Sequence, residues 1–301
     1  MNVKKIYAIE KTIGKLKIHN LDMLAWHTLR FYLNKNLPKY YQNTDILQGE
    51  SSSNLVDKEV IVSLTTFPKR MEKIYITLES LFRQTIRPDH IVLWLADDQY
   101  PDKQAVKEML RKYCMLGLEI KYCDDLRSHK KYYYTMKDNP EAIVITVDDD
   151  IIYPEDMIEE LLKTYLNYPN KIICNRAHLM KKRDGQLLPY NSWTYRAKGY
   201  SGVNIMFCPT GCAGVLYPPH SLSEYVFDKE VLKKICFFAD DIWLKCMGYL
   251  NGTEVVLTGK DNPEVIDVIG ANKMGLAKIN VDQGLNDKQM MDVCEYYGIK
   301  W

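Results

Sequence analysis

Long hydrophobic runs are absent from this sequence. No segment of the 301 residues approaches the roughly 18 consecutive apolar residues that a membrane span requires. Residues 1–15 carry several lysines but lack the apolar centre of a signal peptide. We therefore expect the chain neither to cross a membrane nor to enter the secretory route, and to work in the cytoplasm.

An excess of charge of either sign is also absent. The chain has 40 Lys and Arg against 39 Asp and Glu, for a net charge of +1. Such a balance creates no long-range field that would attract a polyanion. We expect no nucleic-acid partner, and the composition predicts no particular oligomeric state.

Paired metal-binding motifs are missing as well. The six histidines have no ligand spacing and the eight cysteines form no CxxC pair, which argues against a zinc site and against a disulfide scaffold. Reduced thiols in a cytosolic compartment are the simpler interpretation. The cysteines are Cys114, Cys123, Cys174, Cys208, Cys212, Cys236, Cys246 and Cys294.

What is present is the composition of an ordinary folded domain, 47% hydrophobic and 26% charged. We expect a helical appendage and linker over residues 1–55, an α/β domain over residues 56–270, and a tail over residues 271–301 that packs on or covers the site. Leucines at helical spacing predict the appendage. Its aromatic residues suit contact with a membrane surface, and packing against the main domain explains them equally well.

From residue 60 onward, short β-branched runs alternate with amphipathic segments. Such an alternation predicts a mainly parallel, Rossmann-like sheet covered by helices on both faces, which binds ligands at the carboxyl ends of its strands. The predicted strands cover residues 60–68, 90–98, 118–123, 142–150, 171–179 and 254–258, and the predicted helices cover residues 72–85, 101–112, 155–166 and 239–250.

Three adjacent carboxylates, Asp148, Asp149 and Asp150, follow the fourth predicted strand. They repel one another, so a fold rarely places them at the edge of its core without a cation or hydrogen-bond donors. In an extended segment Asp148 and Asp150 point the same way and can address one hard cation, Mg²⁺ or Mn²⁺. Capping of the next helix is the alternative, although three acids exceed what a cap needs.

Four blocks of the sequence resemble a known family. They read VSLTTFPKR, VITVDDDIIYPEDM, TGCAGVLYPP and ADDIWLKCMGYLNGT, and they fall in order over residues 58–260. Together they resemble bacterial glycosyltransferases with the GT-A fold, similar to family 2, which build capsular and other surface polysaccharides. The resemblance implies a GT-A type of Rossmann-like fold and transfer of a sugar from a nucleoside-diphosphate donor, with a UDP-sugar as the first candidate and a GDP-sugar as the second.

The resemblance implies roles for particular residues. Asp148 and Asp150 would bind Mn²⁺ or Mg²⁺ against the donor's diphosphate, where a divalent ion stabilises the charge of the leaving group. The residues assigned to the donor are Thr65, Arg70, Asp97, Lys131 and Asp149. From the residues alone, Thr65 and Asp97 serve equally well to satisfy strand-end backbone or cap a helix, and Arg70 and Lys131 serve as solvated surface charges.

Asp240 and Asp241 open the last predicted helix and resemble the acidic pair in which inverting enzymes keep their catalytic base. Asp241 would take the proton of the acceptor hydroxyl, and Asp240 would orient it or cap the helix. A doubly acidic helix start is the alternative.

Two features of the resemblance stay open. Trp193, Tyr195, Tyr200 and Trp243 can stack on sugar rings, although core packing explains most aromatic residues. Many family members supply a further metal ligand near the C-terminus, often a histidine, and none follows His220 here. Either Asp282 or Asp287 takes its place, or the diphosphate and water complete the coordination.

The predicted acceptor is a glycan or a lipid-linked sugar, which the chain would reach in the cytoplasm or at the inner face of the membrane. A sugar nucleotidyltransferase is one alternative, although such enzymes begin with a glycine-rich loop and the segment TTFPKR has no glycine. A non-catalytic partner that binds nucleotide-sugar is the other alternative.

Overall fold

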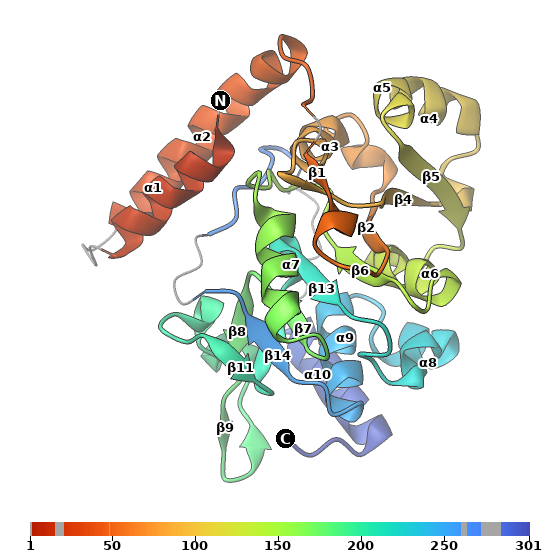
Figure 1. The fold of residues 1–301 in the computed structure, drawn as a ribbon. Helices are drawn as coiled ribbons and strands as arrows, with labels where there is room; N and C mark the ends of the chain where they lie inside the picture. Colours follow the sequence, from red (N-terminus) through yellow and green to blue (C-terminus); the bar gives the residue numbers. More distant parts are fainter. Residues whose placement is uncertain (1, 16–20, 48, 260–263, 272–283) are drawn as a thin grey trace.

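An eight-stranded sheet forms the centre of the protein in a computed structural model (Figure 1). The structure describes residues 2–15, 21–47, 49–259, 264–271 and 284–301. In spatial order the strands are β11 (Gly202–Asn204), β14 (Val255–Leu257), β7 (Ile172–Cys174), β13 (Val215–Tyr217), β6 (Ile143–Thr146), β2 (Val60–Thr65), β4 (His90–Ala96) and β5 (Leu118–Cys123).

Most neighbouring strands of this sheet are parallel. The strands β6, β2, β4 and β5 run the same way, as do β14 and β7, whereas β13 lies antiparallel between β6 and β7 and β11 lies antiparallel at the edge. The predicted α/β class with a mainly parallel sheet is confirmed. The insertion of β13 was not predicted, because its three residues are too short for a periodic pattern.

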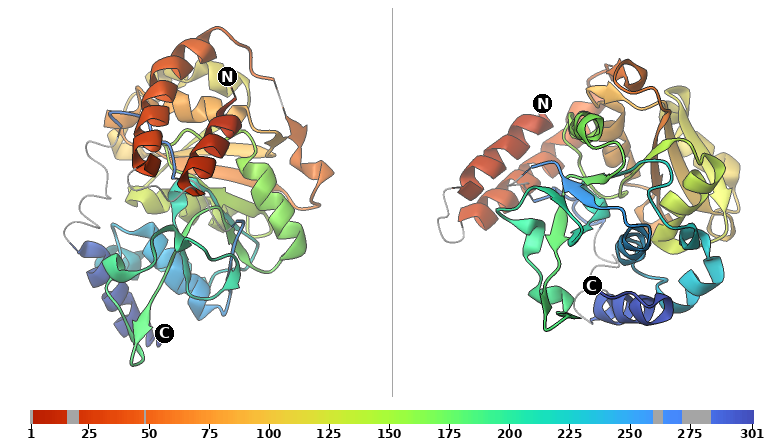
Figure 2. Two further views of the ribbon diagram at one scale, coloured as in Figure 1. Left: turned by 90° about the vertical axis from the view of Figure 1, so that its left-hand side faces the viewer. Right: turned by 60° about the horizontal axis from the view of Figure 1, so that its bottom comes forward.

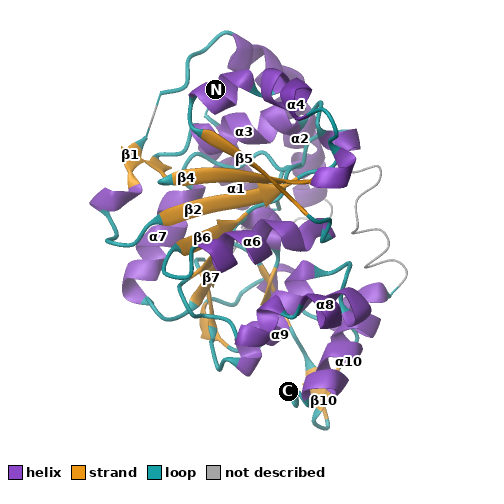
Figure 3. Ribbon diagram, turned by 90° about the vertical axis from the view of Figure 1, so that its right-hand side faces the viewer, coloured by secondary structure: helices purple, strands orange, loops and turns teal. Residues whose placement is uncertain are grey.

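Ten helices lie around the sheet in the described part of the chain, with α7 and α6 on opposite sides (Figure 3). They are α1 (Val3–Lys15), α2 (Leu21–Gln42), α3 (Ile74–Phe82), α4 (Lys103–Met109), α5 (Arg111–Met115), α6 (Lys130–Asp138), α7 (Met157–Asn167), α8 (Lys229–Ile235), α9 (Asp240–Leu250) and α10 (Leu285–Tyr297).

In the described residues, six short strands lie outside the main sheet. The run at residues 171–179, predicted as one strand, divides at Asn175 and Arg176 into β7 and β8, and β8 pairs with β12 in a separate sheet. The short strands are β1 (Glu50–Ser51), β3 (Ile86–Arg87), β8 (Ala177–Leu179), β9 (Lys182–Arg183), β10 (Gln186–Leu187) and β12 (Phe207–Pro209).

The side chains of β2 point alternately to the two faces of the sheet, and helices cover both faces. Val60, Val62 and Leu64 are buried in one cluster with α3 and α7. Ser63 points to the other face, where its hydroxyl lies 2.8 Å from that of Thr135 in α6. Because successive side chains of a strand point to opposite faces, a strand with nearly every side chain buried requires two covering layers.

The N-terminal helices α1 and α2 lie side by side and pack on the main domain (Figure 2). Leu33 and Leu37 of α2 are fully buried. Tyr7 of α1 joins two segments of the main domain, since its hydroxyl donates to the carbonyl of Ile152 and accepts from the amide of Ile266, each at 2.9 Å. The N-terminal segment is thus helical, as its leucine spacing predicts. Within the described residues no helix is both long and apolar enough to span a membrane.

All eight cysteines lie in the described part of the chain, and none of them forms a disulfide. Cys174, Cys208, Cys236 and Cys246 are buried. Their thiols therefore act there as small apolar groups of the core.

His129, directly before α6, is fully buried and neutral. Its Nε2 lies 2.9 Å from the carbonyl of Cys236, and burial lowers the pKa of its imidazole to about 4. The unfolded chain therefore binds more protons than the folded chain between pH 6.5 and 4, so the stability that neutral His129 contributes is lost as the pH falls through this window.

We expect the free energy of unfolding of the wild-type protein to fall by about 2 kcal/mol more than that of His129→Gln between about pH 7 and about pH 5. Urea unfolding followed by circular dichroism at each pH measures this difference. His27→Gln, at an exposed histidine of α2, is the control and should follow the wild-type profile. Parallel profiles for wild type and His129→Gln would contradict the prediction.

Candidate functional site

A cavity of about 1440 Å³ lies at the carboxyl ends of β2 and β6. Its wall includes Thr65 at the end of β2, the Asp148–Asp150 turn after β6, and the first residues of α6 and α9. The cavity is larger than most small-molecule sites, which run to roughly 1,000 Å³. It lies where parallel α/β sheets bind ligands.

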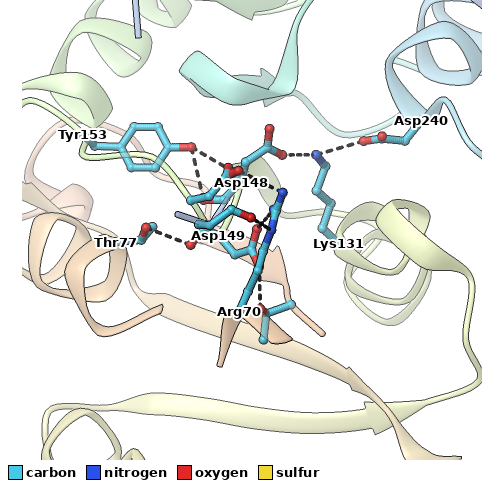
Figure 4. A network of polar contacts seen from close by, with 10 residues as sticks. Arg70, Thr77, Lys131, Asp148, Asp149, Tyr153 and Asp240 are labelled. Atoms are coloured by element: carbon cyan, nitrogen blue, oxygen red, sulfur yellow. Dashed lines mark hydrogen bonds and ion pairs between the residues drawn. The ribbon is translucent and has the colours of Figure 1, made fainter. Parts of the chain in front are cut away.

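The segment after β6 turns instead of staying extended. The strand ends at Thr146, and Asp149 and Asp150 form a turn. One guanidinium holds both carboxylates, because Arg70 Nη1 lies 2.5 Å from Asp149 Oδ1 and Arg70 Nη2 lies 3.0 Å from Asp150 Oδ2 (Figure 4). The expected alternation, with Asp149 pointing away from its neighbours, is therefore wrong.

Backbone hydrogen bonds from distant segments hold this turn. The hydroxyl of Thr77 donates to the carbonyl of Asp149 at 3.0 Å, and the amide of Val268 donates to the carbonyl of Asp150 at 2.7 Å. The amide of Asp148 donates to the hydroxyl of Tyr153 at 2.8 Å (Figure 4). The position of the three carboxylates is thus fixed by the main chain as well as by Arg70.

Lys131, in the first turn of α6, joins the acidic turn to α9. Its Nζ lies 2.6 Å from Asp148 Oδ1 and 2.9 Å from Asp240 Oδ2 (Figure 4). Burial would lower the pKa of this ammonium, but the carboxylates of Asp148, Asp240 and Asp241 outweigh it and hold the pKa well above the ordinary value. Lys131 is therefore charged, and the charge lies beside both acidic segments.

Asp241 approaches Lys131 and Asp148 beside Gly211. The amide of Gly211 donates to Asp241 Oδ1 at 3.0 Å. A Cβ at Gly211 would lie 2.9 Å from Lys131 Nζ, 3.1 Å from Asp241 Oδ1 and 3.6 Å from Asp148 Oδ1. The absent side chain of this glycine therefore lets the three charged groups converge.

The acidic cluster, which we define as Asp148, Asp149, Asp150, Asp240 and Asp241, holds more negative charge than its partners balance. Within the described residues its ion pairs come from Arg70 and Lys131 alone. Burial raises the pKa of Asp150 to about 7, with a further contribution from Asp149. Burial, with the neighbouring Asp240, raises the pKa of Asp241 to about 8. Both carboxyl groups therefore keep a proton more readily than an ordinary aspartate, because burial is not balanced by enough positive charge beside them.

A complete set of metal ligands does not converge in the ranges that the structure describes, where no three His, Cys, Asp or Glu side chains form one. Of the two residues considered for a further ligand, Asp282 lies outside the described residues. Asp287, in α10, accepts a hydrogen bond from the amide of Tyr190 at 2.6 Å.

The two predicted donor residues at strand ends have different positions. Thr65 lines the cavity, and its hydroxyl donates to the carbonyl of Trp94 at 2.8 Å. Asp97 has a 60% exposed side chain, pairs with Lys103 at 2.5 Å and is not among the cavity-lining residues. Gln99, two residues further along, lines the cavity in its place.

The four aromatic candidates also differ in their positions relative to the cavity. Trp193 and Tyr195 line the cavity. Trp243 is fully buried in α9, where its Nε1 donates to the carbonyl of Val226 at 3.1 Å, so it packs in the core and cannot stack on a ligand. Tyr200 is exposed and lies outside the lining.

Several cavity residues carry no signal in the sequence. Trp26 of α2 lines the wall and donates through Nε1 to the carbonyl of Val265 at 2.9 Å. Arg176 and Glu264 also line the cavity, and they lie 3.4 Å apart although 88 positions separate them in the sequence. Such contacts depend on the tertiary fold, so no local pattern predicts them.

No family model and no curated protein matches the sequence. Several solved structures share part of the backbone arrangement. One is a 4-diphosphocytidyl-2C-methyl-D-erythritol synthase, with a TM-score of 0.40 and 11% identity over 69% of this chain and 92% of that chain. A second is S. aureus TarS 1–349 in complex with UDP, with a TM-score of 0.41 and 15% identity over 69% of this chain and 59% of that one.

A third is the mannosyltransferase PcManGT from Pyrobaculum calidifontis in complex with GDP-Man and Mn²⁺, with a TM-score of 0.47 and 12% identity over 91% of this chain and 74% of that chain. At these values the likeness is one of backbone only. The functional assignment of this chain therefore depends on its own side chains.

Arg70→Gln should destabilise the protein by about 3 kcal/mol, because it leaves two buried carboxylates without their cation. Urea unfolding at neutral pH measures the loss. We also expect millimolar Mn²⁺ to raise the melting temperature of Arg70→Gln more than that of wild type, since the variant's cluster carries one more uncompensated charge.

Arg111→Gln is the matched control, because Arg111 pairs with Glu108 on the surface at 3.3 Å with a 70% exposed side chain. An exposed pair of this kind contributes at most about 1 kcal/mol. Equal losses in the two variants would mean that Arg70 does not compensate the acidic turn.

Proposed function

We propose that the protein is a metal-dependent glycosyltransferase that moves a sugar from a nucleoside-diphosphate donor to a hydroxyl of its acceptor. The observation that carries this proposal is the convergence of Asp148, Lys131 and Asp241 on Gly211 in a cavity with unbalanced negative charge. A divalent cation bound to a diphosphate suits this arrangement. The carboxylates would contact the divalent cation, and the phosphates would contact both that cation and Lys131.

Asp148 and Asp150 are the residues that would hold Mn²⁺ or Mg²⁺. Carboxylate oxygens suit these hard cations. The residues fit such an ion because the acidic cluster contains five carboxylates against two cations, and burial already raises the pKa of Asp150 to about 7. When bound, the ion would supply Lewis-acid stabilisation of the departing diphosphate.

The basic side chains beside the acidic turn would bind the donor's phosphates. Arg70 and Lys131 are fixed by ion pairs with the acidic cluster, so they present charge without loss of side-chain freedom on binding. Asp149, whose side chain is 5% exposed, then acts by orienting Arg70. Thr65 and Gln99 line the part of the cavity proposed for the nucleoside, and Asp97 would reach it only if its contact with Lys103 were broken.

Asp241 is the proposed base of an inverting transfer. Its carboxylate takes the proton of the acceptor hydroxyl as the oxygen bonds to C1 of the sugar, and the bond from C1 to the diphosphate oxygen breaks with its electron pair on the leaving group. A carboxyl group whose pKa stands near 8 is a stronger base than an ordinary aspartate. Asp240 would hold Lys131 beside it.

The proposed acceptor is a glycan or lipid-linked sugar of surface polysaccharide synthesis, and the proposed donor is a UDP-sugar or a GDP-sugar. Work at the inner face of the membrane is part of this proposal. Met23, Leu24 and Phe31 on α2 have exposed side chains that suit peripheral contact there.

Replacing Asp148 and Asp150 together by alanine should weaken binding of Mn²⁺ with UDP or GDP by at least about tenfold, because loss of metal ligands costs no less than loss of the groups behind them. Calorimetric titration measures the affinity, with EDTA as the metal-free reference. Asp57→Ala, at an exposed aspartate, is the control. Unchanged cation and nucleotide affinity in the double variant would overturn the proposed function.

Asp241→Asn should lower turnover by roughly 100-fold or more, the usual contribution of a general base, and leave donor affinity within about twofold. A panel of UDP- and GDP-sugars with Mn²⁺, followed by release of free nucleotide, gives the rates. Wild-type turnover in this variant would exclude Asp241 as the base. Donor binding without turnover in the wild type across the panel would favour a non-catalytic nucleotide-sugar-binding protein.

A further inference from the structure

A second charged group lies in the cavity apart from the acidic cluster. Arg176 is 7% exposed and lines the cavity. Its Nη2 lies 3.4 Å from Glu264 Oε1, and Arg196 Nη1 lies 3.7 Å from Glu264 Oε2. Both distances exceed the roughly 2.7–2.9 Å of a strong guanidinium–carboxylate hydrogen bond. Glu264 therefore binds Arg176 weakly, and its carboxylate is shared between Arg176 and Arg196.

Arg176 has donor capacity that the described residues do not use. Its Nη1 donates to the hydroxyl of Thr210 at 2.8 Å, which fixes the guanidinium at the wall. Its Nε is buried and has no hydrogen-bond partner among the described residues. A buried donor without an acceptor costs about 1–3 kcal/mol, so such an arrangement persists where a ligand oxygen supplies what is missing.

The segment that carries Arg196 is strained to bring it here. Arg196 and Ala197 have φ angles of 54° and 43°, a region that residues other than glycine rarely adopt. The amide of Arg196 donates to Nδ1 of His178 at 3.1 Å, and Ala197 is fully buried. Strain of this kind, held by surrounding contacts, is typical of ligand-binding segments.

The two ring groups beside Arg176 carry no charge. Tyr195 lies under Arg176, with 5.1 Å from the guanidinium carbon to the ring centre, and its hydroxyl donates to Glu264 Oε2 at 2.6 Å. Burial, with the adjacent Arg176, lowers the pKa of His178 to about 3, so this imidazole is neutral. Glu264 is thus the one anionic group in contact with Arg176 among the described residues.

The arginine region adjoins the proposed base. Thr210, which accepts the hydrogen bond from Arg176, is next in sequence to Gly211, whose amide binds Asp241. Arg70 and Lys131 belong to the other group of cations, paired with the acidic cluster. A substrate that places its reacting hydroxyl at Asp241 would therefore extend toward Arg176.

We propose that Arg176 and Arg196 form a binding site for an oxyanion, a phosphate or a carboxylate, carried by the acceptor, with Glu264 occupying the site until the acceptor displaces it. Guanidinium groups recognise both kinds of oxyanion through their planar donors. The assignment to the acceptor rests on the proposed function, whereas oxyanion binding at Arg176 does not. The acceptor is then an acidic or phosphorylated sugar.

Two substitutions with opposite outcomes test the site. Arg176→Gln should weaken binding of inorganic phosphate or of D-glucuronate by about tenfold, the effect of one charge-assisted hydrogen bond. Glu264→Gln should strengthen binding of the same probe severalfold, because the competing carboxylate is gone. Calorimetric titration of each full-length variant without metal measures both effects, and the probe with the larger Arg176 dependence distinguishes a phosphate from a carboxylate.

Matched controls are Arg183→Gln in β9 and Glu254→Gln, which pairs with Lys171 on the surface at 2.5 Å. Both should bind the probes as wild type does. If Glu264→Gln weakens binding or leaves it unchanged, the pair with Arg176 is structural and the proposal is overturned. The result for Glu264→Gln remains informative even if Arg176→Gln does not fold. Circular dichroism shows whether Arg176→Gln folds.

A donor comparison separates the acceptor from the donor as the source of the oxyanion. Arg176→Gln should bind UDP-glucose and UDP-glucuronate with the affinities of the wild type. If Arg176→Gln loses affinity for UDP-glucuronate but not for UDP-glucose, the oxyanion belongs to the donor sugar and the acceptor assignment is wrong. Oxyanion binding that depends on Arg176 in a protein that binds no nucleotide would refute the proposed function and leave the oxyanion site standing.

Discussion

The clustered carboxylates after β6 are the constraint on which the rest of the site depends. Asp148, Asp149 and Asp150 repel one another, and the fold compensates them with Arg70 on one side and Lys131 on the other. Neither cation comes from the same element as the turn. The ends of β2 and α6 must therefore meet the end of β6, and this meeting shapes the cavity wall. The compensation is incomplete, so the proposed divalent cation would relieve the remaining repulsion.

Two of the charged regions that line the cavity lie close to each other. The acidic cluster and its two cations form one region, and Arg176 with Glu264 and Arg196 forms the other. The segment of Thr210 and Gly211 joins them, since one residue binds Arg176 and the next binds Asp241. In the proposed reaction the donor's phosphates would lie in the first region and the acceptor's oxyanion in the second, so that the two substrates meet beside Gly211.

Local sequence patterns predicted which strands and helices carry the site, but not the tertiary contacts that complete it. Alternating strands and helices placed Thr65 and Asp148 at carboxyl strand ends, and β5 was predicted at its observed residues 118–123. The conformation of the acidic turn depends on Arg70 and Val268, which approach from elsewhere in the chain, so periodicity predicted an extended segment instead. Contacts made by Trp26 and Arg176 across the fold have no local pattern at all.

The N-terminal helices are part of the same constraint. Arg30 of α2 donates through Nη2 to Asp267 Oδ2 at 2.7 Å, and Asp267 pairs with Ile151 in an isolated antiparallel bridge directly after the acidic turn. The next residue, Val268, donates its amide to the carbonyl of Asp150. The segment from 264 to 271 is thus held between α2 and the acidic turn. Packing of α2 therefore contributes to the geometry of the carboxylates, although no residue of α2 touches them in the described contacts.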